Sequence, residues 1–298
     1  MDFEDDQSLS DASLLSSWDV ATRYHDFKTS KKIKKNDKLS HYLKKISSDA
    51  ILSKAREILG SIVKPVDSLT LPYSEIPFDA HNIDFDLDET LENSPLFNHS
   101  KNKTSANDLY ASFVKPKTQG VVICVDTSLS MTGEKLALTA VAIAVVLLQF
   151  PDDPIGIIAF ENEARVLKYP DETLSIHQLI ERFLDVPAQG YTHLEQGMKS
   201  ALKLISHPRM KQSRKPPATV LLTDGKYTAG RDPAYLASHF PQLTVLKMGN
   251  ERASKNLCLE MAQRGSGVLR EVKELDQLPQ SMYSIVKSII SGNANSLK

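Results

Sequence analysis

Five oxygen-bearing residues in the second half of the chain have the types and spacing of a metal site. Asp126-Thr127-Ser128-Leu129-Ser130 and Thr223-Asp224-Gly225 each follow a run rich in β-branched residues, and Gly190-Tyr191-Thr192 lies between them. Hard cations such as Mg²⁺ take carboxylate and hydroxyl oxygens as ligands, and the absence of His and Cys from the set disfavours zinc and copper. The candidate metal ligands are Asp126, Ser128, Ser130, Thr192 and Asp224.

Alternating strands and helices are expected to position these residues. The hydrophobic pattern predicts strands at 121–125, 155–160, 164–169, 219–223, 244–248 and 268–272, and helices at 132–150, 175–185, 193–206, 233–240, 255–263 and 278–291. Such alternation is typical of an α/β fold, here a mostly parallel six-stranded sheet flanked by helices on both faces. Open sheets of this kind bind ligands at the carboxyl ends of their strands, where Asp126 and Asp224 lie in the sequence.

The three-part pattern Asp-x-Ser-x-Ser, Gly-x-Thr and Thr-Asp-Gly resembles the metal-ion-dependent adhesion site (MIDAS) of von Willebrand factor A (VWA) domains. The resemblance covers about residues 118–291, and Leu129 stands where many members of the family have Gly. It implies a Rossmann-like VWA fold that holds Mg²⁺ or Mn²⁺ with one open position. A partner's Asp or Glu would fill that position, so the family implies a protein-binding module and not an enzyme.

Two further segments resemble particular branches of this family. The end of the domain, from Asp232-Pro233 to Arg264-Gly265-Ser266-Gly267, is similar to the integrin-like domain of magnesium chelatase. The stretch from Asp84 to Leu91 resembles one that precedes the domain in CoxE-like proteins, which are partnered with a MoxR-type AAA+ ATPase. The resemblance implies an adaptor for such an ATPase. The chain has no Gly-x-x-x-x-Gly-Lys-Ser/Thr motif, so the partner would hydrolyse the nucleotide.

Sequence character divides the chain into four parts. Residues 1–64 form a helical region with an acidic start and then a block of lysines, with helices expected at about 14–24 and 39–63. Residues 65–117 are rich in Pro, Ser, Asn and Asp, and they are expected to be an extended, partly disordered connector with a mobile loop at 98–107. The VWA domain is expected at 118–292 and a short tail at 293–298.

Composition and charge disfavour some classes of partner and some cellular compartments. The formal net charge is −1, and the lysine block is interleaved only with Tyr42, so neither indicates nucleic-acid binding. The most apolar stretch, Leu136–Phe150, is shorter than the roughly 20 residues that cross a bilayer. The acidic N-terminal residues do not resemble a signal peptide, and the two cysteines form no metal motif. A cytoplasmic protein without a membrane partner is expected.

One enzymatic alternative exists. Asp86-Leu87-Asp88-Glu89-Thr90 resembles the first motif of haloacid-dehalogenase-type phosphatases, which would make Asp86 the nucleophile and Asp88 the general acid of an Mg²⁺-dependent reaction. That chemistry needs a buried apolar strand before Asp86, but residues 80–85 are too polar. An acidic connector is favoured. Whether this acidic stretch occupies the chain's own metal site stays open.

Overall fold

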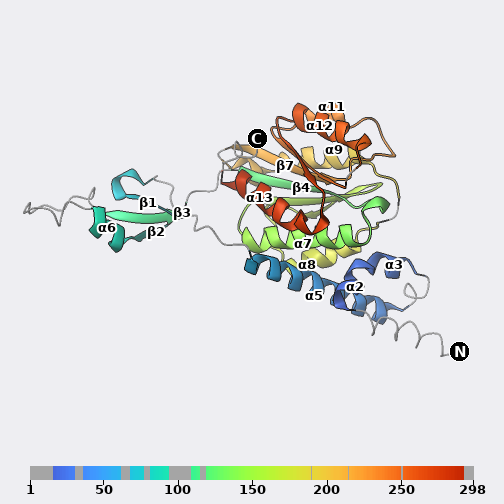
Figure 1. Cartoon of the computed structure of the whole chain (residues 1–298). Helices are drawn as coiled ribbons and strands as arrows, with labels where there is room; N and C mark the ends of the chain where they lie inside the picture. Colours follow the sequence, from blue (N-terminus) through green and yellow to red (C-terminus); the bar gives the residue numbers. More distant parts are fainter. Residues whose placement is uncertain are drawn as a thin grey trace, which may run out of the picture. The chain divides into compact units, whose positions relative to one another are not determined.

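The computed structural model describes residues 16–30, 36–61, 68–76, 81–93, 109–114, 119–188, 190–213, 215–249 and 251–291. The chain divides into two compact units, one made of residues 1–62 and 118–298 and the other of residues 63–117 (Figure 1). Within the described residues, no helix is both long enough and apolar enough to cross a membrane.

The larger unit is built on a six-stranded sheet with the strand order β6-β5-β4-β7-β8-β9. Its strands are β4 (Gln119–Asp126), β5 (Ile155–Phe160), β6 (Ala164–Lys168), β7 (Lys215–Thr223), β8 (Leu243–Met248) and β9 (Leu269–Val272). All neighbouring strands are parallel except the β5–β6 pair, which is antiparallel. The α/β fold predicted from the sequence is confirmed. The antiparallel pairing of β6 follows from its short connection, since only three residues separate it from β5.

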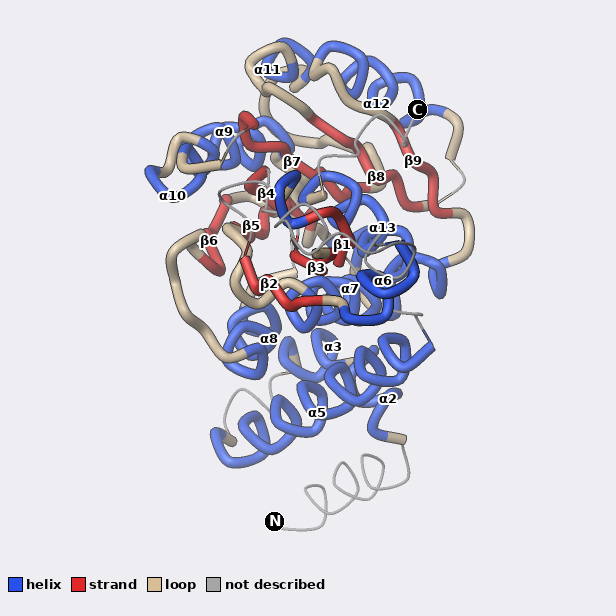
Figure 2. Tube along the Cα trace, turned by 90° about the vertical axis from the view of Figure 1, so that its left-hand side faces the viewer, coloured by secondary structure: helices blue, strands red, loops and turns tan. Residues whose placement is uncertain are grey.

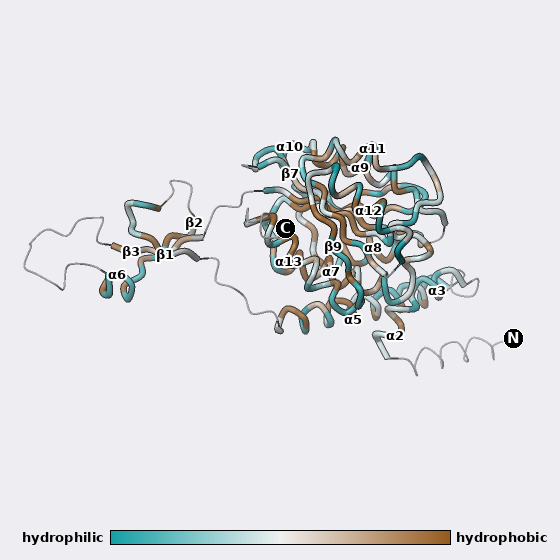
Figure 3. The backbone as a smooth tube through the Cα atoms, turned by 45° about the horizontal axis from the view of Figure 1, so that its top comes forward, coloured by the Kyte–Doolittle hydropathy of each residue, from teal (hydrophilic) through white to brown (hydrophobic). Residues whose placement is uncertain are grey.

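Helices cover both faces of this sheet. On one face lie α7 (Glu134–Gln149), α8 (Ile176–Asp185) and α13 (Leu278–Ile290), and on the other lie α9 (Leu194–Ile205), α10 (Pro208–Lys211), α11 (Ala234–Ala237) and α12 (Ala253–Arg264) (Figure 1). Alternate residues of β4 point to opposite cores: Val121, Ile123 and Val125 join one, and Val122 and Cys124 the other. The central strands are accordingly apolar along their length (Figure 3). Short 3₁₀ turns, η4 (Leu129–Met131) and η5 (Leu275–Gln277), precede α7 and α13.

An additional helical layer covers α7 and α8 on the side away from the sheet. It consists of α2 (Ser17–Thr22), α3 (Tyr24–Thr29) and α5 (Asp37–Ser61) (Figure 2). Every residue of α7 from Leu136 to Leu147 is buried, because α13, α5, α8 and α2 pack around this helix and its side chains share one core with residues of the sheet. A helix that is apolar all round needs such enclosure. The apolar stretch therefore reflects a helix at the centre of a layered core.

The N-terminal helices share one core with the sheet domain. Val20, Tyr24 and Ile51 are buried in the same cluster as the α7 side chains. Two lysines of the lysine block also have partners here: Lys28 Nζ donates to the Leu184 and Asp185 carbonyl oxygens at 2.9 and 2.6 Å, and Lys44 forms an ion pair with Asp185 at 2.8 Å. Burial lowers the pKa of Lys28. Cations stabilise helix C-termini, so these lysines complete the end of α8.

The smaller unit differs from the extended connector predicted for residues 65–117. It contains β1 (Ser68–Pro72), the 3₁₀ turn η1 (Tyr73–Glu75), β2 (His81–Phe85), α6 (Leu87–Asn93) and β3 (Tyr110–Val114). The strands form an antiparallel sheet in the order β1-β3-β2, with Ala111 and Phe113 buried. Each strand has five residues and depends on a partner distant in sequence, so local pattern gave little sign of it. The loop predicted at 98–107 and the tail predicted at 293–298 lie outside the described residues.

Candidate metal centre

Two adjacent strands bring Asp126 and Asp224 to one edge of the sheet. β4 ends at Asp126 and β7 at Thr223, and the two strands are parallel neighbours, so both carboxyl ends lie together. Thr223 Oγ1 donates to Asp126 Oδ2 at 2.8 Å and accepts from the Gly225 amide at 3.0 Å. This hydroxyl therefore ties the residue that follows Asp224 to the carboxylate of Asp126.

The loop after β4 folds its two serines toward each other. The Ser128 amide donates to Asp126 Oδ1 at 2.9 Å, and the Ser128 and Ser130 hydroxyl oxygens lie 3.2 Å apart. Lys135, in the first turn of α7, donates from Nζ to the Ser130 carbonyl oxygen at 3.1 Å. The structure thus places the Asp126 carboxylate and both serine hydroxyls in one hydrogen-bonded group.

Thr192 reaches the same edge from the loop before α9. Its amide donates to Thr228 Oγ1 at 2.9 Å, and its carbonyl oxygen accepts from the Thr228 amide at 3.1 Å. Thr228 lies four residues after Asp224, so these two bonds hold the Thr192 loop against the loop that carries Asp224. All five sequence-predicted residues therefore lie at the carboxyl ends of the central strands or in the loops that meet there.

Two buried carboxylates lie at this edge of the sheet, so a bound cation there would be electrostatically favourable. Asp126 is fully buried and Asp224 is 5% exposed, and neither forms an ion pair with a basic side chain in the described part of the chain. Burial raises the pKa of Asp126 to about 6, and the nearby Asp224 carboxylate adds to the increase, while hydrogen bonds from Ser128 and Thr223 oppose it. Buried carboxylates are normally paired or bound to a metal. Two carboxylates and three hydroxyls fit a hard divalent cation.

A buried glutamate braces the loop that follows Asp224. Glu195 on α9 is 6% exposed, and its carboxylate accepts from the Arg231 amide at 3.0 Å, from Tyr235 Oη at 2.6 Å and from Lys199 Nζ at 2.6 Å. These bonds lower the pKa of Glu195 to about 2, with the Arg231 amide the largest cause. Glu195 therefore holds the 226–235 segment against α9. It lies three residues after Thr192 in the sequence.

Several residues that shape the site were not singled out from the sequence. Thr223 stands in the Thr-Asp-Gly motif, but its hydrogen bond to Asp126 was not predicted. Thr228 and Glu195 carry no local signal, because each acts through a contact with a loop far away in sequence.

The two cysteines are not suited to bind a metal. Cys124 and Cys258 are buried thiols; burial raises the pKa of Cys258 to about 12 and that of Cys124 further. Thiols this hard to ionise are poor metal ligands. Across the described ranges there is no group of three or more His, Cys, Asp or Glu arranged to hold a metal. Three of the five candidate ligands, Ser128, Ser130 and Thr192, are hydroxyl residues, so the candidate set contains only two acids.

Asp86 has a capping role in the smaller unit. Its Oδ1 accepts from the Glu89 amide at 3.0 Å, and its carbonyl oxygen accepts from Thr90 at the first turn of α6. The strand before it, β2, belongs to a three-stranded antiparallel sheet and not to a parallel Rossmann-like core. The phosphatase arrangement needs such a core to place Asp86 and Asp88, so this geometry gives it no support.

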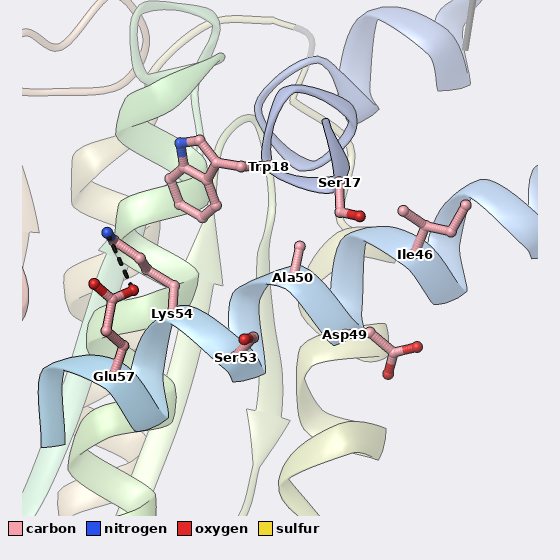
Figure 4. Close-up of a pocket in the computed structure, with 8 residues that line it drawn as sticks. All are labelled: Ser17, Trp18, Ile46, Asp49, Ala50, Ser53, Lys54 and Glu57. Atoms are coloured by element: carbon pink, nitrogen blue, oxygen red, sulfur yellow. Dashed lines mark ion pairs between the residues drawn. The ribbon is translucent and has the colours of Figure 1, made fainter. Parts of the chain in front are cut away.

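The N-terminal helices carry a distinct pocket outside the metal centre. It has a volume of about 630 Å³ and lies between α2 and α5 (Figure 4). It is lined by Ser17, Trp18, Ile46, Asp49, Ala50, Ser53, Lys54 and Glu57. Lys54 and Glu57 face each other at 3.5 Å along its wall, and the Trp18 ring forms its apolar part (Figure 4).

Comparisons with known proteins find similarity in the larger unit. Residues 121–226 match the model of the von Willebrand factor type A domain. Over 177 residues, or 53% of the chain, the sequence is 27% identical to inter-alpha-trypsin inhibitor heavy chain H6 of Homo sapiens, and the match spans 13% of that protein's length.

Two of the similar solved structures are from a bacterium and from a mussel. A conserved hypothetical protein, BatB, of Bacteroides thetaiotaomicron is 17% identical, with a TM-score of 0.45 over 57% of this chain and 98% of its own. Proximal thread matrix protein 1 from the mussel byssus, solved with a zinc-occupied MIDAS motif, is 15% identical, with a TM-score of 0.47 over 59% of this chain and 48% of its own. Residues 121–226 are therefore similar to a von Willebrand factor type A domain, and the mostly parallel six-stranded sheet that contains them has the α/β fold expected from that similarity.

Proposed function

We propose that the chain is a metal-dependent protein-binding module. In this proposal Asp126, Ser128, Ser130, Thr192 and Asp224 hold a divalent cation, and the cation captures a carboxylate from a partner protein. The observation that carries the proposal is the meeting of two buried carboxylates and three hydroxyl-bearing residues at the carboxyl edge of the sheet, with no ion pair to either carboxylate from the described side chains.

The donor set favours Mg²⁺ or Mn²⁺ as the cation. All five groups offer oxygen, which hard cations prefer, and Mg²⁺ usually keeps several waters when proteins bind it. Two carboxylates balance the charge of a divalent ion, while the three hydroxyls are neutral. A water-filled coordination position can then be taken by an Asp or Glu from outside, which binds more strongly than water.

Exposed apolar side chains adjoin the proposed ligands in sequence and suit a protein partner. Leu129, between the two serines, is 63% exposed, and Tyr191, directly before Thr192, is 67% exposed. Tyr227, three residues after Asp224, is 38% exposed. Tyrosine is enriched at protein interfaces, where it contributes large contact areas at little entropic cost. These side chains would flank a docked carboxylate.

The partner is proposed to be an AAA+ ATPase of the MoxR or magnesium-chelatase type, with this chain as its adaptor. The resemblance of residues 232–267 to the integrin-like domain of magnesium chelatase and of residues 84–91 to CoxE-like proteins supports this proposal. The pocket between α2 and α5 (Figure 4) offers a second contact surface, because it combines an aromatic ring with charged groups. The chain would then bind and position a partner, and would not itself catalyse a reaction.

Thermal unfolding with and without metal tests the cation site. Because a ligand that binds only the folded state stabilises it, Mg²⁺ or Mn²⁺ should raise the Tm of the whole chain. Asp224→Asn, which deletes an anionic ligand with little change in shape, should abolish this increase, while Asp152→Asn, an exposed control, should keep it. The absence of a metal-dependent shift in the unaltered chain would contradict the proposal.

Affinity capture tests the partnership. The unaltered chain in Mg²⁺ should retain an AAA+ ATPase that is lost in EDTA and lost with Asp224→Asn. If the proteins retained in a Mg²⁺-dependent manner include no AAA+ ATPase, the adaptor role is wrong and the module serves another partner.

A further inference from the structure

The smaller unit exposes many large apolar side chains for its size. Tyr73, Ile83, Phe85, Leu87 and Leu91 are each at least 40% exposed. They are five of the twelve exposed large apolar side chains among the described residues, although residues 63–117 make up less than a fifth of the chain. A single exposed apolar side chain needs no explanation, but a group of neighbouring ones is typical of an interaction site.

Two aromatic residues meet at the end of the small sheet where β3 begins. The Tyr73 amide donates to the Leu109 carbonyl oxygen at 2.8 Å, and the Asp86 amide donates to the Tyr110 carbonyl oxygen at 2.9 Å. These bonds hold η1 and the end of β2 to the first residues of β3. The rings of Tyr73 and Phe85 are therefore in contact, with their centroids 5.5 Å apart.

Helix α6 adds a pair of leucines at the same end of the sheet. Thr90 is buried, and its Oγ1 atom accepts from the Tyr110 amide at 2.8 Å, so this side of α6 faces β3 (Figure 1). Leu87 and Leu91 are four residues apart, a spacing that places them on one face of a helix, and they are 70% and 51% exposed. Leu87 is separated from Phe85 by one residue, so the leucines continue the exposed surface of the aromatic pair.

Acidic side chains lie beside this surface without basic ones. Asp88 and Glu92 are exposed, and each directly follows one of the two leucines, so they form an acidic row next to the apolar one on α6. Between residues 65 and 100 the sequence contains eight Asp and Glu residues and no Lys or Arg. The described acids of the smaller unit therefore have no basic partner among the described residues of that unit.

Apolar side chains together with acidic charge favour one class of partner. An acidic surface repels the phosphates of nucleic acids and the head groups of anionic lipids. A basic segment without apolar residues would leave the leucines in water, and an apolar segment without charge would leave the carboxylates unpaired. A protein segment with apolar side chains beside Lys or Arg complements both, and an amphipathic helix matches the spacing on α6.

We propose that Tyr73, Phe85, Leu87 and Leu91, with the acidic row of α6, form a further docking surface that takes a basic amphipathic segment of a partner protein. The four apolar side chains pack against the apolar face of that segment, and the carboxylates pair with its Lys or Arg. None of these groups is a proposed metal ligand, so docking here needs no cation. The inference goes beyond the proposed function and does not rest on it.

Binding of a defined peptide to the whole chain tests the apolar part of this surface. The probe is a fluorescent peptide of about 14 residues with Leu and Lys at helical spacing, and fluorescence anisotropy in EDTA gives its Kd. Because burying one leucine side chain is worth about a factor of 10 in affinity, Leu87→Ser should raise the Kd about 10-fold. Tyr42→Ser removes a comparably exposed apolar side chain from α5 and should leave the Kd unchanged. The Tm of each variant should match that of the unaltered chain, because both side chains are exposed.

A second matched pair of variants tests the acidic part. Asp88→Asn combined with Glu92→Gln should weaken binding at low salt and reduce the loss of affinity on adding salt, because salt screens what the carboxylates contribute. Asp152→Asn combined with Glu163→Gln removes two exposed charges from the larger unit and should do neither. Peptides with Ser in place of Leu, or with Glu in place of Lys, should not bind.

Failure of this inference is distinguishable from failure of the proposed function. Asp224→Asn should bind the peptide as the unaltered chain does, whatever its effect on metal binding. The inference is overturned if the unaltered chain does not bind the peptide, or if Leu87→Ser leaves the Kd within about twofold. It is also overturned if phosphatidylserine vesicles or duplex DNA bind in a manner that Leu87→Ser weakens, since the surface would then serve a membrane or a nucleic acid.

Discussion

The Asp126 carboxylate is fixed in direction before any ligand arrives. Its Oδ1 accepts from the Ser128 amide and its Oδ2 from the Thr223 hydroxyl, and the Gly225 amide in turn donates to that hydroxyl. A chain of three hydrogen bonds therefore runs from one loop to the other through two side chains. Such preorganisation lowers the entropy that a ligand must remove on binding, because the groups are already aligned.

Glu195 offers a residue-scale prediction about stability. Glu195→Gln weakens bonds to the Arg231 amide, Tyr235 and Lys199, all accepted by one ionised group. Bonds to charged groups contribute more than neutral ones, so the free energy of unfolding at pH 7 should fall by about 2 kcal/mol. Urea unfolding measures the loss, and Glu163→Gln, an exposed carboxylate, is the control. An unchanged free energy would show that Glu195 does not brace the loop.

The same pair of proteins should respond to pH in a definite direction. The pKa of Glu195 falls from 4.5 to about 2 on folding, so its contribution is present above pH 4.5 and is lost as the pH falls toward 2. The difference in unfolding free energy between the unaltered chain and Glu195→Gln should therefore be full at pH 7 and smaller at pH 3. A difference that grows on acidification would contradict the assignment.

Elements with a strong hydrophobic pattern could be predicted from the sequence, and those that depend on distant partners could not. The strand predicted at 155–160 is β5 itself, and the helix predicted at 278–291 is α13 to within one residue. Both lie in the main core, where nearly every inward-facing residue is apolar. β1 and β3, by contrast, pair across more than thirty-five residues of chain and are five residues each. The prediction of an extended connector followed from their weak local pattern.

In the candidate site, the proposed ligands could be selected from the sequence, but the residues that support them could not. The five proposed ligands stand in short motifs at strand ends, so residue type and spacing were enough to select them. The groups that support them include Thr228, four residues after Asp224, and Glu195 on α9. Their effect depends on burial and on contacts across the fold, which no local pattern contains.

An element-scale prediction concerns the packing of α5 on α7. Ile51 is fully buried in the core shared by the two helices. Ile51→Ala should lower the free energy of unfolding by about 2–4 kcal/mol, because it removes buried methyl groups and leaves a cavity. Lys45→Ala on the exposed side of the same helix should change it by less than about 0.5 kcal/mol. In urea, the larger unit is expected to unfold in a single transition. A loss confined to a separate early transition would show that α5 folds apart from the sheet.

For the whole molecule, the division into two units predicts which segment can be removed. Replacing residues 63–117 by a flexible Gly/Ser linker should leave the Tm of the larger unit unchanged, because its core draws on residues 1–62 and 118–298. Deleting residues 1–62 should instead expose the outer side of α7, lower the Tm and increase binding of a hydrophobic dye. Equal stability of both deletions would contradict the shared core.

Because α7 is enclosed on all sides, it should accept few substitutions during evolution. A surface helix tolerates polar replacements at every third or fourth position, where its outer side meets water. Residues 136–147 have no such side, since all are buried among α5, α8, α13 and the sheet. Selection should therefore act on this stretch as on a continuous apolar block, and compensating changes would have to arise in α5 and the sheet together. Because α7 starts four residues after Ser130, substitutions in the N-terminal helices and in the loop that carries the proposed ligands are expected to be coupled through this helix.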